Sequence, residues 1–100
     1  MNQISKVSDI TAQDVADYIR LDEIDASDTN TLNYLIQVAK AFMSNYTGRT
    51  EEELDNYKDF VIVLMILVQD MWDNRTMYVD TTNLNFVVDS ILHLHSVNLL

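Results

Sequence analysis

Hydrophobic side chains recur along most of the chain at the three- and four-residue spacing of an α-helix. The spacing is clearest between residues 29 and 47, where it persists over about four turns. The apolar positions there are Leu32, Leu35, Ile36, Ala39, Phe42, Met43 and Tyr46. The pattern predicts an all-α fold, a compact bundle of four main helices. These helices are expected at about residues 12–20, 29–47, 51 or 56–74, and 85–95.

Capping residues mark several of the predicted helix ends. Thr11 is expected to cap the first helix, with Asp14 near the positive end of its dipole. Gly48, the only glycine, suits a left-handed stop for the second helix. Residues 50–53 (TEEE) have the pattern of a capping box. This box either starts the third helix or makes one short turn before the helix restarts at residue 55 or 56.

The third predicted helix is apolar on every side over residues 60–68. This run is much shorter than the roughly 20 residues that a membrane span needs, so we interpret it as a buried helix. Met71 and Trp72 continue the helical stripe beyond the length of a strand, and core packing is the favoured interpretation of Trp72. Such a helix must be covered on all sides. In a chain this small, part of that cover is expected to come from another copy of the protein.

The last predicted helix follows a polar and β-branched link at residues 76–82. Either Asn83 or Asn85 can cap it. Its expected apolar stripe starts at Phe86 or Val87 and continues through Ser90, Ile91 and Leu94.

Composition limits the classes of protein to consider. The 100 residues predict a single domain over 1–100, with 1–9 flexible. Sixteen acidic and six basic side chains give a net charge of -10, which argues against DNA binding by phosphate neutralisation and against a basic membrane-surface helix. The absence of cysteine excludes disulfides and thiolate sites. No proline and one glycine favour helices with short connections.

Motifs for catalysis or metal binding are missing. His93 and His95 are two residues apart, so on a helix they point to different sides and cannot share a metal ion. The acidic stretch that starts at Asp22 fails the EF-hand pattern, because Ile24 and Ala26 stand where oxygen ligands are needed. One glycine excludes a glycine-rich phosphate loop, and no serine stands in a GxSxG pattern. The sequence therefore predicts no catalytic residue, no metal and no cofactor, and a protein that is not an enzyme.

Candidate interaction residues are few. Arg49 and Arg75 follow predicted helix ends and allow two interpretations: compensation of the helix dipole, worth about 0.3–1 kcal/mol, or an ion pair at a protein interface, where arginine is enriched. Tyr78 is a candidate interface anchor. The apolar end with Leu99 and Leu100 is expected to dock onto the chain's own core or onto a partner.

Four segments resemble the small phage head–tail connector (adaptor) family, as found in phages and prophages of Gram-positive bacteria. They are residues 10–22 (ITAQDVADYIRLD), 39–49 (AKAFMSNYTGR), 71–75 (MWDNR) and 90–95 (SILHLH). Their order and spacing hold over roughly residues 10–100. One departure is the lack of the proline that many members carry before the last helix, so the link at 76–85 is expected to differ in shape.

The resemblance implies an all-α virion structural protein. Its copies would form a dodecameric ring beneath the portal protein, extend the DNA channel and receive the next connector, stopper or tail component. Some relatives are called DNA-packaging proteins because the connector closes the head after packaging. The implied location is the head–tail junction of the virion, assembled in the host cytoplasm, with no membrane partner. Subunit or portal contacts are expected at Arg49, Arg75, Tyr78, Leu99 and Leu100.

The acidic charge is compatible with this role. A negative lumen would not hold phosphates, so DNA would pass through without specific binding. The alternative from a different class is a small acidic helical regulator that binds one protein partner through a helix face. Such a regulator would form a defined small complex and never a ring.

Overall fold

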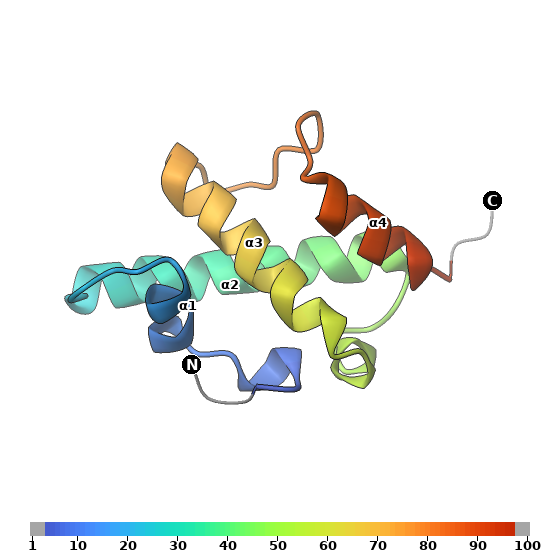
Figure 1. Cartoon of the computed structure of the whole chain (residues 1–100), viewed down its shortest axis with the longest axis horizontal. Helices are drawn as coiled ribbons and strands as arrows, with labels where there is room; N and C mark the ends of the chain where they lie inside the picture. Colours follow the sequence, from blue (N-terminus) through green and yellow to red (C-terminus); the bar gives the residue numbers. More distant parts are fainter. Residues whose placement is uncertain (1–3, 98–100) are drawn as a thin grey trace.

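The computed structural model describes residues 4–97, and these form an all-α fold without strands, as the sequence pattern predicts. Four α-helices and two 3-10 turns follow one another along the chain (Figure 1). In chain order they are η1 (Val7–Asp9), α1 (Ala12–Tyr18), α2 (Ala26–Thr47), η2 (Glu53–Asn56), α3 (Asp59–Asn74) and α4 (Phe86–Leu94). The long helix α2 runs along the longest axis, and α3 crosses it and packs against α1, α2 and α4.

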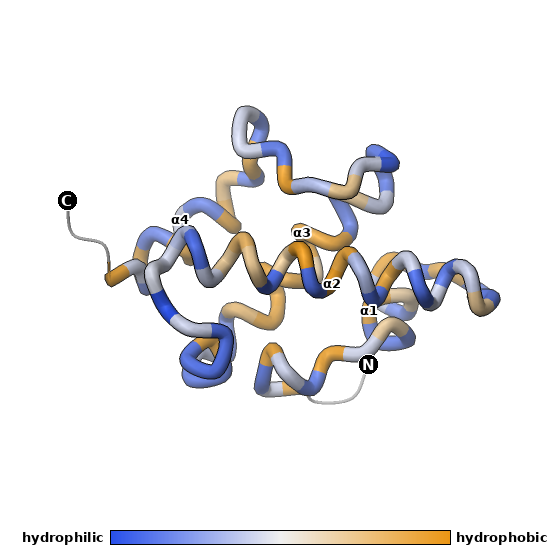
Figure 2. Tube along the Cα trace, turned by 180° about the vertical axis from the view of Figure 1, so that it is seen from behind, coloured by the Kyte–Doolittle hydropathy of each residue, from blue (hydrophilic) through white to orange (hydrophobic). Residues whose placement is uncertain are grey.

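Helix α3 is the centre of the hydrophobic core. Most of its apolar side chains are buried, and the hydrophobic colours in Figure 2 gather on α3 and α4. The buried residues of α3 are Phe60, Val61, Val63, Leu64, Met65, Leu67, Val68 and Met71. Only Ile62 among its large apolar side chains is exposed, at 38%. The chain's own helices therefore supply most of the cover that this helix needs, and the expectation that another copy supplies part of it stays a prediction.

Helix α2 begins earlier than the expected residue 29. Asp25 is its N-cap, and the Asp25 carboxylate accepts a hydrogen bond from the backbone N–H of Asp28 at 2.7 Å. The Asp28 carboxylate in turn accepts from the backbone N–H of Asp25 at 3.2 Å, which closes a capping box. The acidic stretch is thus partly a helix start. The sequence conceals this because Ala26 and Ser27 add no hydrophobic periodicity ahead of the apolar stripe.

Other helix ends agree with their predicted signals. Thr11 and Asp14 form the capping box of α1. Gly48 ends α2 with φ 74°, a left-handed conformation that glycine adopts without a Cβ clash. The backbone N–H of Thr50 donates to the Glu53 carboxylate at 2.9 Å, which is the main cause of the lowered pKa of Glu53, and the backbone N–H of Glu53 donates to the Thr50 Oγ1 at 3.2 Å. Their box starts the short turn η2, and α3 begins separately at Asp59.

The first described segment packs against the body of the protein, although the sequence predicts that residues 1–9 are flexible. Val7 is buried in the core. Both the backbone N–H and the Oγ of Ser8 donate to the Asp55 carboxylate, at 2.9 and 2.7 Å. The hydrogen bond from the Ser8 side chain is the main cause that lowers the pKa of Asp55. These two bonds join η1 to η2.

Replacing Asp55 with asparagine should lower the free energy of unfolding at pH 7 by about 1 kcal/mol. The folded protein lowers the pKa of Asp55. The ionised carboxylate therefore stabilises the fold at pH values above the ordinary carboxyl pKa, and this stabilisation is lost as the pH falls through the pKa of the folded state. Urea unfolding of both proteins should therefore show a difference in unfolding free energy at pH 7 that narrows as the pH falls below about 4. Asp22→Asn, in an exposed link, should leave stability unchanged at both pH values. A gap that stays constant with pH would contradict this account.

Candidate functional site

Two of the segments that carry the family resemblance meet in space. The Nε of Arg49, just after α2, donates to the backbone carbonyl of His95 at the end of α4, at 2.7 Å. The Arg49 guanidinium also lies 4.8 Å from the centre of the Tyr57 ring, and it is 3.8 Å from the carboxylate of Glu53. Its side chain is only 19% exposed. Arg49 thus satisfies a terminal carbonyl of α4, a partner that neither sequence interpretation named.

His95 completes this arrangement, which we call the Arg49–His95 clasp (Arg49, Tyr57, Asp59, Phe60 and His95). The Nε2 of His95 lies 2.9 Å from a carboxylate oxygen of Asp59, the first residue of α3. The imidazole packs against Tyr57 at 4.2 Å and meets the edge of Phe60 at 5.1 Å between ring centres. The clasp joins the ends of α2 and α4 to the start of α3.

The rest of the tyrosine–threonine–glycine–arginine segment is also structural. Thr47 is fully buried, and its Oγ1 donates to the Met43 carbonyl at 2.7 Å. The Thr47 carbonyl accepts from the backbone N–H of Val97 at 2.8 Å. The hydroxyl of Tyr46 donates to Asp89 of α4 at 2.6 Å, and this hydrogen bond is the main cause that raises the pKa of Tyr46. The segment therefore fixes α4 against α2.

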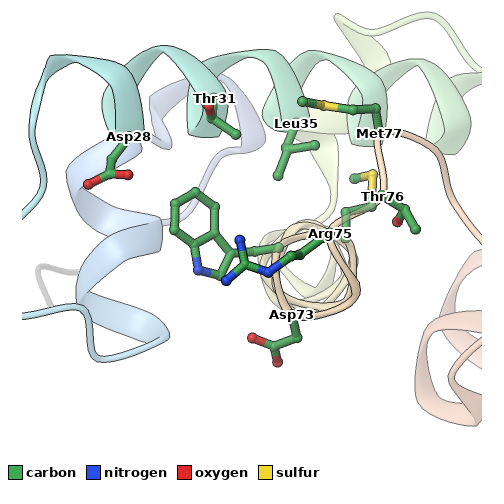
Figure 3. A pocket seen from close by; sticks show the side chains of 9 residues that line it. Asp28, Thr31, Leu35, Asp73, Arg75, Thr76 and Met77 are labelled. Atoms are coloured by element: carbon green, nitrogen blue, oxygen red, sulfur yellow. The ribbon is translucent and has the colours of Figure 1, made fainter.

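Arg75 stands in a different environment. It ends α3 in a left-handed conformation with φ 56°, its side chain is exposed, and it takes part in no ion pair within residues 4–97. It lines a cleft of about 550 Å³, the Arg75 cleft, between the first half of α2 and the end of α3. The lining residues are Asp28, Thr31, Leu35, Met71, Trp72, Asp73, Arg75, Thr76 and Met77. Figure 3 shows the Arg75 side chain extending along the cleft towards the side of Asp28.

The chemistry of the Arg75 cleft fits a protein side chain better than a reaction. The exposed Met77 and the half-buried Trp72 give it apolar surface, whereas Leu35 and Met71 line it but are almost fully buried. The carboxylate of Asp28 already serves the N-terminus of α2. No group of three or more histidine, aspartate or glutamate side chains within 4–97 is arranged to hold a metal ion.

The outer side of α4 is a second feature, and it corrects the predicted stripe. Val88 and Leu92 point into the core, whereas Phe86 is 81% exposed, Leu94 74% and Val87 49%. We call these three exposed side chains the α4 ridge. The polar residues Asp89, Ser90 and His93 share one side of α4, and the periodicity favours the side of Ile91, but the helix packs rotated from it, with Val88 and Leu92 inward.

The predicted interface residues fall into three groups. Tyr78 and Arg75 are exposed and follow the end of α3, as an interface role requires. Arg49 donates a hydrogen bond to the backbone carbonyl of His95 in its own chain. Leu99 and Leu100 lie outside the described residues.

Comparisons with known proteins add no relative: no family model, no curated protein and no solved structure matches this chain. None of the helices within residues 4–97 is both long and apolar enough to cross a membrane.

Proposed function

We propose that this protein is a virion structural protein, a subunit of a phage head–tail connector ring. The ring docks under the portal protein, extends the DNA channel, and joins capsid to tail once DNA is packaged. The subunit acts by assembly, so it needs surfaces for other proteins rather than a catalytic residue. It binds other copies of itself, the portal protein and the next connector, stopper or tail component.

The observation that carries the proposal is the exposure of large apolar side chains in a strongly acidic chain. Phe86 and Leu94 on α4, with Met77 and Tyr78 after α3, are each more than half exposed. A chain of charge -10 has ample polar side chains, yet it leaves these apolar ones in solvent. These side chains belong to two separate surfaces, one after α3 and one on α4, and exposed apolar surface of this kind is typical of protein-interaction sites. The order of the four connector-like segments supports the same class.

Cosedimentation with a portal ring tests this function. The full chain, mixed with the portal protein encoded in the same genome, is expected to migrate with the ring through a density gradient. A matched sample with bovine serum albumin in place of the portal protein controls for non-specific binding. Migration of the chain only at the top of the gradient in both samples would contradict the proposal.

Duplex DNA should not bind the isolated protein. The net charge of -10 opposes phosphate contacts, and low salt strengthens that repulsion. A gel-shift assay with a mixed-sequence duplex at about 0.05 M salt is therefore expected to show only free DNA. A retarded band at micromolar protein would contradict the proposed passage of DNA without binding.

The second candidate is a small acidic helical regulator with one protein partner. The α4 ridge supports it, because a single exposed apolar helix face is sufficient to dock on one partner. The two functions differ in stoichiometry. A regulator gives a complex with one or two copies of this chain, whereas a connector gives a closed ring.

A further inference from the structure

We propose that the α4 ridge of one copy binds in the Arg75 cleft of the next copy, so that subunits join head to tail. This inference deepens the proposed connector function and rests on it for the closure of a ring. It assigns the two faces of the subunit contact and names the occupant of each.

The α4 ridge is built to be covered. Val88 and Leu92 already anchor α4 in the core, so Phe86 and Leu94 contribute nothing to it while 81% and 74% exposed. Residues 76–97 contain two carboxylates, Asp80 and Asp89, and neither lysine nor arginine. The ridge therefore presents an aromatic ring and an aliphatic side chain on a segment that has no lysine or arginine of its own.

The Arg75 cleft has the complementary properties. Its volume of about 550 Å³ lies within the range of ligand pockets in proteins. Met77 is 53% exposed and offers apolar contact, and the half-buried Trp72 offers an aromatic wall, whereas Leu35 and Met71 line the cleft but are almost fully buried. Arg75 brings a guanidinium that is free of ion pairs within the described part of the chain.

The two surfaces match chemically. An arginine cation is attracted to the face of an aromatic ring, and Phe86 is the most exposed aromatic side chain within 4–97. Asp28 and Asp73 also line the cleft and would repel a second acidic ridge, so the contact depends on apolar burial and on Arg75.

The placement of the two surfaces determines the geometry of assembly. The molecule measures 43 × 29 × 19 Å, and the cleft lies towards the end of the long axis where α2 begins, while α4 lies towards the other end (Figure 1). A contact between different surfaces of identical copies propagates, and it forms a ring when the rotation closes. Since ridge and cleft belong to the same chain, a second copy supplies both partners.

The charge of -10 on each copy opposes the contact, so added salt should strengthen the contact between copies.

Mixing two complementary variants tests the proposal. The ridge variant carries Phe86→Ser with Leu94→Ser, and the cleft variant carries Arg75→Glu with Met77→Glu. All four positions are exposed, so thermal unfolding should be close to that of the wild type. Tyr34→Ser, on α2 and part of neither surface, is the control. Sedimentation velocity is measured in about 0.5 M sodium chloride at up to about 1 mM protein.

The wild type and the Tyr34→Ser control are expected to self-associate, and each double variant alone should be monomeric. The mixture has one intact ridge and one intact cleft per pair, so it should form a heterodimer and stop there. Self-association of the cleft variant as strong as that of the wild type would overturn the proposal in favour of a ridge-to-ridge contact. The proposal would also be overturned if the mixture stays monomeric while the wild type associates. A wild type that is itself monomeric at about 1 mM would overturn it as well.

Failure here is distinguishable from failure of the proposed function. A chain that migrates with the portal ring but gives no heterodimer remains a connector candidate whose subunit faces differ from those assigned. If the mixed variants form a heterodimer but the chain does not bind the portal ring, the two assigned faces are supported and the connector function is contradicted.

Discussion

Replacing Arg75 with glycine is expected to stabilise the folded chain and yet weaken its assembly at least tenfold. The stabilisation, about 0.5–1 kcal/mol, follows from φ 56° at this position, where a Cβ is unfavourable and glycine is not. The loss of assembly follows because the variant lacks the guanidinium of the Arg75 cleft, and arginine is enriched among residues that dominate binding energy. Thermal unfolding and cosedimentation with the portal ring measure the two effects separately.

Arg20 provides a matched control for this variant. It also has a left-handed backbone, with φ 64°, and its side chain is exposed outside the Arg75 cleft and the α4 ridge. Arg20→Gly should therefore raise stability to a similar extent and leave assembly unchanged. Assembly of Arg75→Gly at the wild-type level, or a sharp fall in its melting temperature, would show that Arg75 has only a structural role.

Replacing Arg49 with alanine should lower the free energy of unfolding by about 2 kcal/mol. The variant loses a largely buried, charge-assisted hydrogen bond to the His95 carbonyl, worth about 1.5–3 kcal/mol. It also loses the contact with the Tyr57 ring, while the long, exposed pair with Glu53 adds little. Arg49→Lys should recover only part of the loss, because an ammonium group lacks the planar geometry of the guanidinium.

Chemical unfolding monitored by circular dichroism checks this prediction. Lys58→Ala removes one exposed positive charge near the clasp and should change stability by no more than about 0.5 kcal/mol. If Arg49→Ala unfolds like the wild type but fails to assemble, the interface interpretation of Arg49 is correct and the clasp contributes little. We expect the opposite: Arg49→Ala should be less stable, and under conditions where it is folded it should assemble like the wild type.

Local signals in the sequence were sufficient to predict the elements of the fold. The apolar stripe of α2, the glycine at its end and the box at residues 50–53 each depend on neighbours within one or two turns, so the printed sequence reveals them. The start of α2 at Ala26 was missed because the Asp25–Asp28 box lies ahead of the apolar stripe. The packed side of α4 was missed because the helix is rotated from the side that its periodicity favours, and contacts with α2 and α3 decide that rotation.

The candidate site depended on contacts between distant residues, and these were harder to predict. Arg49 and His95 are 46 positions apart, and no spacing rule joins an arginine to a backbone carbonyl at that separation. The Arg75 cleft likewise combines side chains of early α2 with the end of α3. The exposure of Arg75 and Tyr78 could not be told from their place after a helix end, because Arg49 has a similar place and is mostly buried.

The most direct test of the central claim, that this chain acts by assembly, is native mass measurement with negative-stain imaging. The protein is observed alone and after mixing with the portal ring of the same genome. We expect a second ring of several copies of this chain stacked beneath the portal, even if the free protein is monomeric. A stable monomer at high concentration, with bare portal rings in the mixture, would contradict the connector account and favour the small-regulator alternative.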